Sequence, residues 1–225
     1  MSVLDNPVWT SLTGPHSRFA RRNGGAVRYL PDVAPFLAIP DESAWPDVAA
    51  LAGAGTVVTV AGVAPPADWD LVEEIPGVQL VDAGVTAAPA PEAVRLTIDD
   101  VPDMLALVEK TRPGPFLART IELGTYLGIR RDGRLVAMAG ERLHPPGWTE
   151  ISAVCTDPAF RGQGLAAGLV RALVASIRAR GEQALLHAAA ANTGAIRLYQ
   201  SMGFRLRMSP VFSVLRVPAH ERLLS

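Results

Sequence analysis

The residues best suited to do chemistry lie at 154–166, in the run Val-Cys-Thr-Asp-Pro-Ala-Phe-Arg-Gly-Gln-Gly-Leu-Ala. An apolar strand ends here, a turn with proline follows, and small residues begin an amphipathic helix. The first N–H groups of a helix lack partners within the helix and lie at the positive end of its dipole. Gly162 and Gly164 leave these groups accessible, Ala166 keeps the next turn compact, and Arg161 adds a positive charge. The pattern predicts a site for an anion such as a diphosphate, and a tight turn made for packing is the alternative.

A second group of polar side chains lies further along the chain, at the start of another helix. The run Asn-Thr-Gly-Ala-Ile-Arg-Leu-Tyr-Gln-Ser-Met-Gly-Phe covers 192–204. Asn192 and Tyr199 are seven residues apart, which is two helical turns, so they share one face of the helix. A tyrosine placed there for packing alone is the alternative to a tyrosine that faces a ligand.

These two segments belong to a regular succession of strands and helices. Apolar residues at helical spacing predict a helix over 165–177, with arginines away from its apolar face. The pair Asp132-Gly133 lies between two apolar runs and predicts a hairpin. We expect strands at 95–98, 126–130, 135–143, 150–156, 184–187 and 211–217, and further helices through 104–108 and over 193–202. Strands that first form a hairpin and then alternate with helices predict an α+β fold with one β-α-β crossover.

The first 88 residues give shorter and more mixed signals. We expect strands at 28–30, 56–60 and 78–81, and helices near 47–51 and 67–74. No catalytic set of side chains appears there, and His16 with the arginines at 18, 21 and 22 is interpreted as solvated surface. This part holds 10 acidic and 4 basic residues, against 12 and 17 in the remainder. A proline-rich stretch at 87–92 marks the change, so we expect an accessory α/β domain over 1–88, open to being a degenerate copy of the second, and a second domain over 89–225.

Composition narrows the classes of function. Hydrophobic residues make up 49% of the 225 and charged residues 19%, which is enough for a sizeable core. The net charge of −1 argues against nucleic acid as a partner. The lone cysteine, Cys155, excludes an internal disulfide, and the four scattered histidines do not indicate a metal site. The uncharged stretch 48–67 contains glycines and prolines that favour a helix end, a turn and a strand over a membrane span. We therefore expect a cytoplasmic protein without signal peptide, metal, nucleic-acid or membrane partner.

Both segments resemble motifs of the GNAT superfamily of N-acetyltransferases. Arg161-x-x-Gly164-x-Ala166 after an apolar strand is similar to the acyl-CoA diphosphate motif, Gln/Arg-x-x-Gly-x-Gly/Ala. Asn192 follows 28 residues after Gly164 and opens a run similar to the second motif, an asparagine before a helix that carries a tyrosine and ends in Gly-Phe. The resemblance covers roughly residues 93–218. Within the superfamily, glycine N-acyltransferase-like proteins look most similar, because they also carry a variable N-terminal domain.

The resemblance implies a fold and a set of roles. The sheet would be largely antiparallel and flanked by helices, and strands 150–156 and 184–187 would splay apart at a bulge. The pantetheine arm of acetyl-CoA, the expected co-substrate, would insert between them, and Asn192 would hydrogen-bond it. Tyr199 would protonate the departing CoA thiolate, a step that suits a phenol because it keeps its proton at neutral pH. The cofactor-binding residues would be Val154, Cys155, Thr156, Arg161, Gly162, Gln163, Gly164, Leu165, Ala166, Asn192 and Tyr199.

A base must also take a proton from the acceptor ammonium. Glu150 matches the position of the catalytic glutamate in histone-type members of the superfamily. By alternation it would share a face with Ser152, Val154 and Thr156, and partial burial would raise its pKa toward that of a useful base. A surface charge at the edge of the strand is the equally weighted alternative. Glu141 is the reserve candidate, and a water chain without a dedicated base is also common in the superfamily.

Three further residues carry side chains that could react with or bind a substrate. Cys155 is taken as a small buried residue, because no adjacent histidine or cation is evident to lower its pKa. His187 ends a buried strand and is taken as a hydrogen-bonded core histidine. In the superfamily the acceptor is chosen by segments that correspond to 111–122 and 144–148 of this chain. Arg119, in the first of them, could bind a carboxylate of the acceptor. A purely structural loop explains these residues equally well.

Together these observations predict an acyl-CoA-dependent N-acetyltransferase. An acetyl or other short acyl group would pass from acyl-CoA to a primary amine by direct attack in a ternary complex. The acceptor would be a small-molecule or amino-acid-like amine, and the sequence is compatible with an oligomer. The alternative is a module that binds acyl-CoA without catalysis, as a sensor or scaffold.

Overall fold

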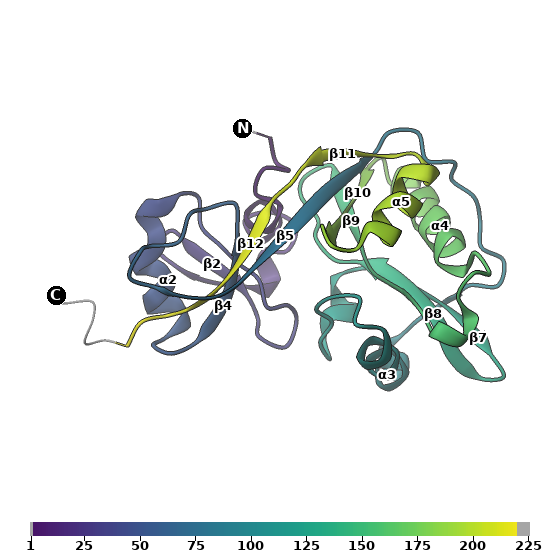
Figure 1. Ribbon diagram of the computed structural model, residues 1–225, viewed down its shortest axis with the longest axis horizontal. Helices are drawn as coiled ribbons and strands as arrows, with labels where there is room; N and C mark the ends of the chain where they lie inside the picture. Colours follow the sequence, from purple (N-terminus) through teal and green to yellow (C-terminus); the bar gives the residue numbers. More distant parts are fainter. Residues whose placement is uncertain (1, 220–225) are drawn as a thin grey trace.

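The computed structural model describes residues 2–219 and divides them between two lobes (Figure 1). A nine-stranded sheet in the order β4-β12-β5-β10-β9-β8-β7-β6, with β11 paired to β5, extends through both lobes. Strands β4 and β12 and the first half of β5 lie with the N-terminal lobe, and the other strands form the C-terminal lobe (Figure 1). Every pair in this sheet is antiparallel except β9 with β10, which are parallel. The predicted mixed fold with one β-α-β crossover is confirmed. The strands are β4 (Val57–Ala61), β5 (Asp70–Asp82), β6 (Val94–Arg95), β7 (Tyr126–Arg131), β8 (Arg134–Glu141), β9 (Trp148–Thr156), β10 (Gln183–Ala189), β11 (Phe204–Met208) and β12 (Val211–Arg216).

Three helices pack on this sheet. Helix α3 (Val101–Thr111) lies against β8 and β9, whereas α4 (Leu165–Ala179) forms the crossover between β9 and β10. Helix α5 (Thr193–Met202) begins at the predicted residue and ends where Gly203 adopts a left-handed conformation. The apolar stripe of α4 is fully buried against the sheet, including Leu169 and Leu173. Burial on that scale contributes about 1.5–3 kcal/mol per large side chain, so it fixes the first turn of α4 at the end of β9.

The N-terminal lobe has its own small sheet and core. Strands β1 (Ala20–Asn23), β2 (Ala26–Tyr29) and β3 (Leu37–Ala38) pair antiparallel, between α1 (Pro7–Leu12) and α2 (Trp45–Ala52). The uncharged stretch at 48–67 consists of the end of α2, a glycine turn and β4 before it enters a loop, as expected. Within residues 2–219, no helix has the length and apolar character needed to cross a membrane.

One long strand joins the two lobes. The first half of β5 pairs with β12, and its second half pairs with β10 and β11 (Figure 1). The helix predicted near 67–74 is therefore wrong: from Asp70 onward this segment is strand, because hydrogen bonding to β12 outweighs its local helix preference. Although β5 precedes the expected boundary at residue 88, its second half pairs with β10 and β11 of the C-terminal lobe. The division into folding units at residue 88 stays a proposal.

Candidate active site

A bulge in β9 shapes the centre of the C-terminal lobe. Between the pairs Gly140↔Ser152 and Met138↔Cys155, β9 advances three residues while β8 advances two. The extra residue lies at Ala153, which has a left-handed φ of 51°. A side chain in this conformation is strained, and such residues concentrate at functional sites. The bulge bends β9 away from its parallel neighbour at this point.

Beyond the bulge, β9 and β10 separate. Their last paired residues are Ile151 and Leu186, although β9 continues to Thr156 and β10 to Ala189. The backbone of β9 past the bulge thus has β8 on one side and an opening on the other. This is the splay that the sequence resemblance implied.

The bulge also changes which side chains of β9 share a face. Ile151 packs in the core beneath α4, and so does Val154, whereas Ala153 and Cys155 pack in the core beneath α3. In a regular strand Ile151 and Val154 would lie on opposite faces. The expectation that Glu150 shares a face with Val154 and Thr156 is therefore wrong. The extra residue inverts the alternation, and only Ser152 stays on the side of Glu150.

The loop between β9 and α4 is open where an anion would bind. Gly162 and Gly164 have φ of +79° and +75°, and a Cβ atom added at either would meet no atom within 4 Å. Gly164 is the N-cap of α4 and offers no side chain to cap its first turn. The helix therefore presents backbone donors and the positive end of its dipole to this loop. Arg161 is exposed beside it.

A groove of about 530 Å³ runs from this loop to α5. Ten of the eleven predicted cofactor-binding residues line it together, and Gln163 is the exception. The end of α3 forms a further wall that neither motif indicated, because that helix is remote from both motifs in the chain. The residues along the groove are Thr111, Arg112, Pro113, Val154, Cys155, Thr156, Phe160, Arg161, Gly162, Gly164, Leu165, Ala166, Ala167, Asn192, Gly194, Ala195, Leu198 and Tyr199.

Two of these residues sit on the same face of α5, as their spacing predicts. The Oδ1 atom of Asn192 accepts a hydrogen bond of 3.2 Å from the N–H of Ala195 and so caps the helix. Because this oxygen is committed to the cap, the amide nitrogen of Asn192 is the atom that can donate to a ligand in the groove. Tyr199 is 7% exposed and makes an edge contact with the ring of Phe204.

Electrostatics keep Tyr199 and Cys155 in their protonated forms. Burial raises the pKa of Tyr199 to about 12, and its proximity to Cys155 adds to the increase. Burial also raises the pKa of Cys155 to about 11, so this thiol holds its proton at neutral pH. A phenol in the groove can therefore act as a proton donor, while Cys155 has none of the character of an activated nucleophile.

Glu150 lies away from the groove, at the junction of the two lobes. It is completely buried and accepts two hydrogen bonds from Arg142. Nε of Arg142 is 2.9 Å from Oε2, and an Nη atom is 2.7 Å from Oε1. Nδ1 of His187 is 2.8 Å from the same Oε1 atom. Burial opposes the charge of Glu150, but Arg142 and His187 outweigh it and hold the pKa of this carboxyl well below its usual range. The prediction that the pKa of Glu150 is raised is therefore wrong. The local sequence does not show that Arg142 is the partner of this carboxylate.

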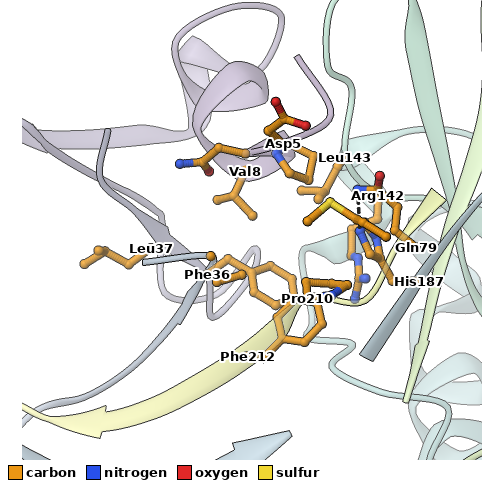
Figure 2. Close-up of a pocket in the computed structure, with 15 residues that line it drawn as sticks. Asp5, Val8, Phe36, Leu37, Gln79, Arg142, Leu143, His187, Pro210 and Phe212 are labelled. Carbon is orange, nitrogen blue, oxygen red and sulfur yellow. Dashed lines mark hydrogen bonds between the residues drawn. The ribbon is translucent and has the colours of Figure 1, made fainter. Parts of the chain in front are cut away.

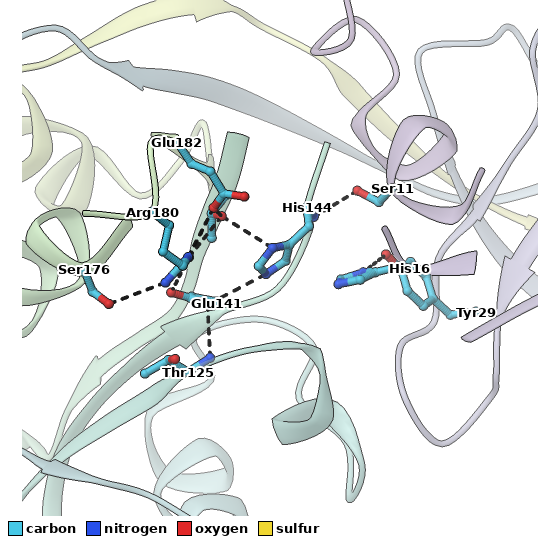
Figure 3. Close-up of polar contacts among 10 residues, drawn as sticks. Ser11, His16, Tyr29, Thr125, Glu141, His144, Ser176, Arg180 and Glu182 are labelled. Atoms are coloured by element: carbon cyan, nitrogen blue, oxygen red, sulfur yellow. Dashed lines mark hydrogen bonds and ion pairs between the residues drawn. The ribbon is translucent and has the colours of Figure 1, made fainter. Parts of the chain in front are cut away.

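The reserve candidate, Glu141, is also engaged by other groups. Its Oε1 accepts a hydrogen bond of 3.0 Å from Arg180, and its Oε2 accepts one of 3.1 Å from the backbone of Thr125 (Figure 3). His144 lies beside it, with Nε2 3.8 Å from Oε2, and that nitrogen has no hydrogen-bond partner. These contacts anchor the end of β8 and leave Glu141 outside the groove.

His16 is buried between the lobes, so its interpretation as solvated surface is wrong. Its Nδ1 atom is 2.8 Å from the hydroxyl of Tyr29, and its ring centroid is 4.9 Å from that of His144 (Figure 3). Burial, followed by the neighbouring charge of His144, lowers the pKa of His16 to about 3. The imidazole is therefore neutral at physiological pH, and it packs between the lobes in contact with Tyr29 and His144.

The segment expected to choose the acceptor contacts the N-terminal lobe instead. Arg119 donates to both carboxylate oxygens of Glu122 and also pairs with Asp32 at 3.1 Å. Phe116 is buried against the ring of Tyr126. The structure therefore supports the structural alternative for these two residues.

Comparisons with known proteins agree with this geometry. The family model described as FR47-like protein matches residues 126–213, a region that contains both motifs. The crystal structure of a GNAT-family acetyltransferase from Novosphingobium aromaticivorans is 40% identical, covers 96% of this chain and 99% of its own, and superposes with a TM-score of 0.87. A GCN5-related N-acetyltransferase from Kribbella flavida, at 18% identity and a TM-score of 0.64 over 94% of this chain and 95% of its own, shares the fold.

Two curated relatives match shorter regions. A mycothiol acetyltransferase of Thermobispora bispora is 46% identical over 56 residues, which are 24% of this chain and 19% of the relative. The N-alpha-acetyltransferase RimI of Mycobacterium tuberculosis is 39% identical over 83 residues, 36% of this chain and 51% of the relative. The chain thus spans between about a fifth and a half of the curated relatives that it matches.

Proposed function

Because the chain belongs to the GNAT family of acetyltransferases, we propose that it transfers an acetyl or other short acyl group from acyl-CoA to a primary amine. The transfer is a direct attack in a ternary complex, without an acyl-enzyme. The observation that carries this proposal is that a buried tyrosine with a raised pKa shares one groove with an open glycine loop at a helix N-terminus. The thiol of Cys155, with its raised pKa, gives no support to a covalent route.

Different parts of the groove offer contacts for the diphosphate and for the pantetheine arm of acyl-CoA. The loop of Gly162 and Gly164 at the first turn of α4 can bind the diphosphate through backbone N–H groups, with Arg161 as an additional positive charge. The opened edge of β9 between Val154 and Thr156 offers the pantetheine arm backbone partners, as an added strand would find them. The amide nitrogen of Asn192 can donate to the arm from the other side.

Tyr199 is proposed as the acid that protonates the departing CoA thiolate. Because its pKa is raised, the hydroxyl keeps its proton at neutral pH and has it available for the thiolate as that group departs. A module that only binds acyl-CoA has no need of an acid at this position. The tyrosine therefore favours the enzyme over a sensor or scaffold.

The acceptor is proposed to be a compact primary amine. The relatives' names include mycothiol acetyltransferase and N-alpha-acetyltransferase, so both a small molecule and the α-amine of a peptide are worth testing. The resemblance to glycine N-acyltransferase-like proteins adds free amino acids to this set. The lone cysteine fits a reducing compartment, and we propose that the reaction takes place in the cytoplasm.

Thermal unfolding with acetyl-CoA, CoA and a longer acyl-CoA tests the cofactor part of the proposal. A ligand at about 100 times its Kd adds roughly 2.7 kcal/mol to the native state, and each kcal/mol moves the midpoint by about 2–4 °C for a chain of this size. An increase with acetyl-CoA supports the site and justifies an assay for release of the CoA thiol with glycine, cysteine and an alanyl peptide as acceptors. If no acyl-CoA raises the midpoint at millimolar concentration, the groove does not bind the proposed co-substrate.

A further inference from the structure

The hydrogen bonds around His187 fix which ring nitrogen carries the proton. The amide of Gln79 is oriented by two independent partners: Arg207 donates to its Oε1 at 2.9 Å, and its Nε2 donates to the carbonyl of Leu4 at 3.0 Å. The same Nε2 lies 3.0 Å from Nε2 of His187. An amide nitrogen can only donate, so Nε2 of His187 accepts and Nδ1 holds the proton that it donates to Glu150. His187 is thus a neutral imidazole with its lone pair directed away from Glu150.

This lone pair lies on the opposite side of the sheet from Tyr199. Leu186 packs beneath α4 in the same core as Tyr199 and Val154. Because side chains alternate along β10, His187 points to the other face. His187 is also the first residue of β10 beyond the last pair with β9, so it sits where the two strands begin to separate. A thioester carbonyl held in the splay would have Tyr199 on one side and His187 on the other.

His187 lines a cavity between the two lobes (Figure 2). Val8 and Phe36 of the N-terminal lobe form one wall, and Phe212 of β12 makes an edge contact with the imidazole. The cavity volume is about 30 Å³, which admits an amino group or one or two water molecules and nothing larger. The amide nitrogen of Gln79 occupies the position where a donor to Nε2 would sit.

We propose that His187 is the general base of this enzyme and that the acceptor amine takes the place of the Gln79 amide nitrogen against Nε2. This inference rests on the proposed acetyl transfer and adds its acceptor side. Glu150 is a positioning residue: it holds the proton on Nδ1 and stabilises the imidazolium that forms, while Arg142 keeps Glu150 ionised.

With these groups, every proton transfer and bond change of the acetyl transfer is accounted for. Nε2 of His187 takes one proton from the acceptor ammonium, and the amine lone pair forms the C–N bond with the thioester carbonyl. The C–S bond breaks with its electron pair on sulfur, and Tyr199 gives that thiolate its proton. The nitrogen loses a second proton, which restores the tyrosine through solvent, and His187 returns its own proton to water.

The polar and charged groups around His187 come from five segments of the chain. Glu150 faces it from β9, with Arg142 behind that carboxylate, and Gln79 faces it from β5. Behind Gln79, Arg207 of β11 pairs with Asp5 of the N-terminal segment. These contacts leave Nε2, on the side of Gln79, as the ring atom that can take a proton from the amine.

The test compares His187→Gln with His16→Gln in the full chain. His16 is a matched control, because it is a second histidine buried at the lobe junction that lines neither the groove nor the cavity. Release of the CoA thiol is measured against pH with acetyl-CoA and the amine that the wild type accepts best among glycine, cysteine and an alanyl peptide. Binding of CoA is measured in parallel by thermal shift.

Support for the inference is a loss of kcat of about 100-fold and a changed pH profile in His187→Gln, with CoA binding unchanged, while His16→Gln keeps the wild-type kcat. A kcat of His187→Gln within about 3-fold of wild type, with the pH profile unchanged, overturns the base and leaves the proposed function standing. A wild type that binds CoA but acetylates no amine overturns both. Nitrogen NMR of the wild-type imidazoles gives a readout without turnover, since a proton on Nε2 of His187 at neutral pH would also overturn the assignment.

Discussion

Arg142, directly after β8, and Glu150 of β9 form a two-point ion pair that is almost entirely buried. The side chain of Arg142 is 11% exposed and that of Glu150 is 0% exposed. A charge pair at this depth is stable only while both partners are present, because either charge alone would be buried without compensation. The same carboxylate orients His187, so one buried pair links the stability of the junction to the proposed chemistry.

Removal of one partner is expected to destabilise the protein strongly. Arg142→Met leaves Glu150 as an unpaired buried charge, and we expect the free energy of unfolding to fall by about 3–5 kcal/mol. Chemical denaturation measures this change. Arg119→Met is the matched control, because Arg119 pairs with Asp32 and Glu122 on the surface and its loss should have a much smaller effect. Equal effects of the two substitutions would contradict a special role for the buried pair.

Acid is expected to destabilise the lobe junction through His16. Burial lowers the pKa of this imidazole to about 3, whereas an unfolded histidine has a pKa near 6.5. Between these values the unfolded chain binds more protons, so stability falls as the pH falls, by at most about 1.4 kcal/mol per pH unit from this group. His16→Asn, which can keep the hydrogen bond to Tyr29, should reduce the slope of stability against pH over this window. Identical slopes for the variant and the wild type would show that His16 does not titrate as described.

Tyr199→Phe should separate catalysis from binding. The substitution removes the proton donor and keeps the ring that packs against Phe204, so we expect kcat to fall about 100-fold and the thermal shift with acetyl-CoA to persist. Because burial raises the pKa of Tyr199 to about 12, the wild type should show no loss of rate from this group on the alkaline side up to about pH 10. An unchanged kcat in the variant would mean that another group protonates the thiolate.

Gly164→Ala should weaken both CoA binding and folding. The residue has a left-handed φ of +75°, where an alanine costs about 1–2 kcal/mol, and its Cβ would project into the open space of the diphosphate loop. We expect about 10-fold weaker CoA binding from obstructed access to the backbone donors. Gly168→Ala is the matched control, because it lies inside α4 with open space around it and should stabilise the helix by about 0.5–1 kcal/mol. Calorimetric titration with CoA distinguishes the two.

Features of the site that depend on local chain chemistry could be predicted. The periodic leucines of α4, the left-handed glycines before it and the seven-residue spacing of Asn192 and Tyr199 each depend on residues close together in the chain. Local hydrogen bonding and helical geometry decide such features. The groove is therefore lined by nearly all the residues that the two motifs indicated.

Features that depend on distant partners could not be predicted. The segment after Asp70 has a local pattern that fits a helix, and only its pairing with β12, more than a hundred residues later, makes it a strand. The bulge at Ala153 inverts the faces of β9 because β8 pairs with it out of step. His16 and Glu150 were assigned from their neighbours in sequence, whereas the packing of the two lobes determines their burial.

By itself the sequence determined the order of strands and helices in the C-terminal part, the acyl-CoA motifs and the tyrosine beside them. Only the tertiary structure decided that Glu150 is held by Arg142 and that Nε2 of His187 faces the lobe junction, where it accepts from Gln79. The physical reason is that the charge state of a buried group depends on how burial balances against its partners. Those partners come from strands that meet only after the chain has folded.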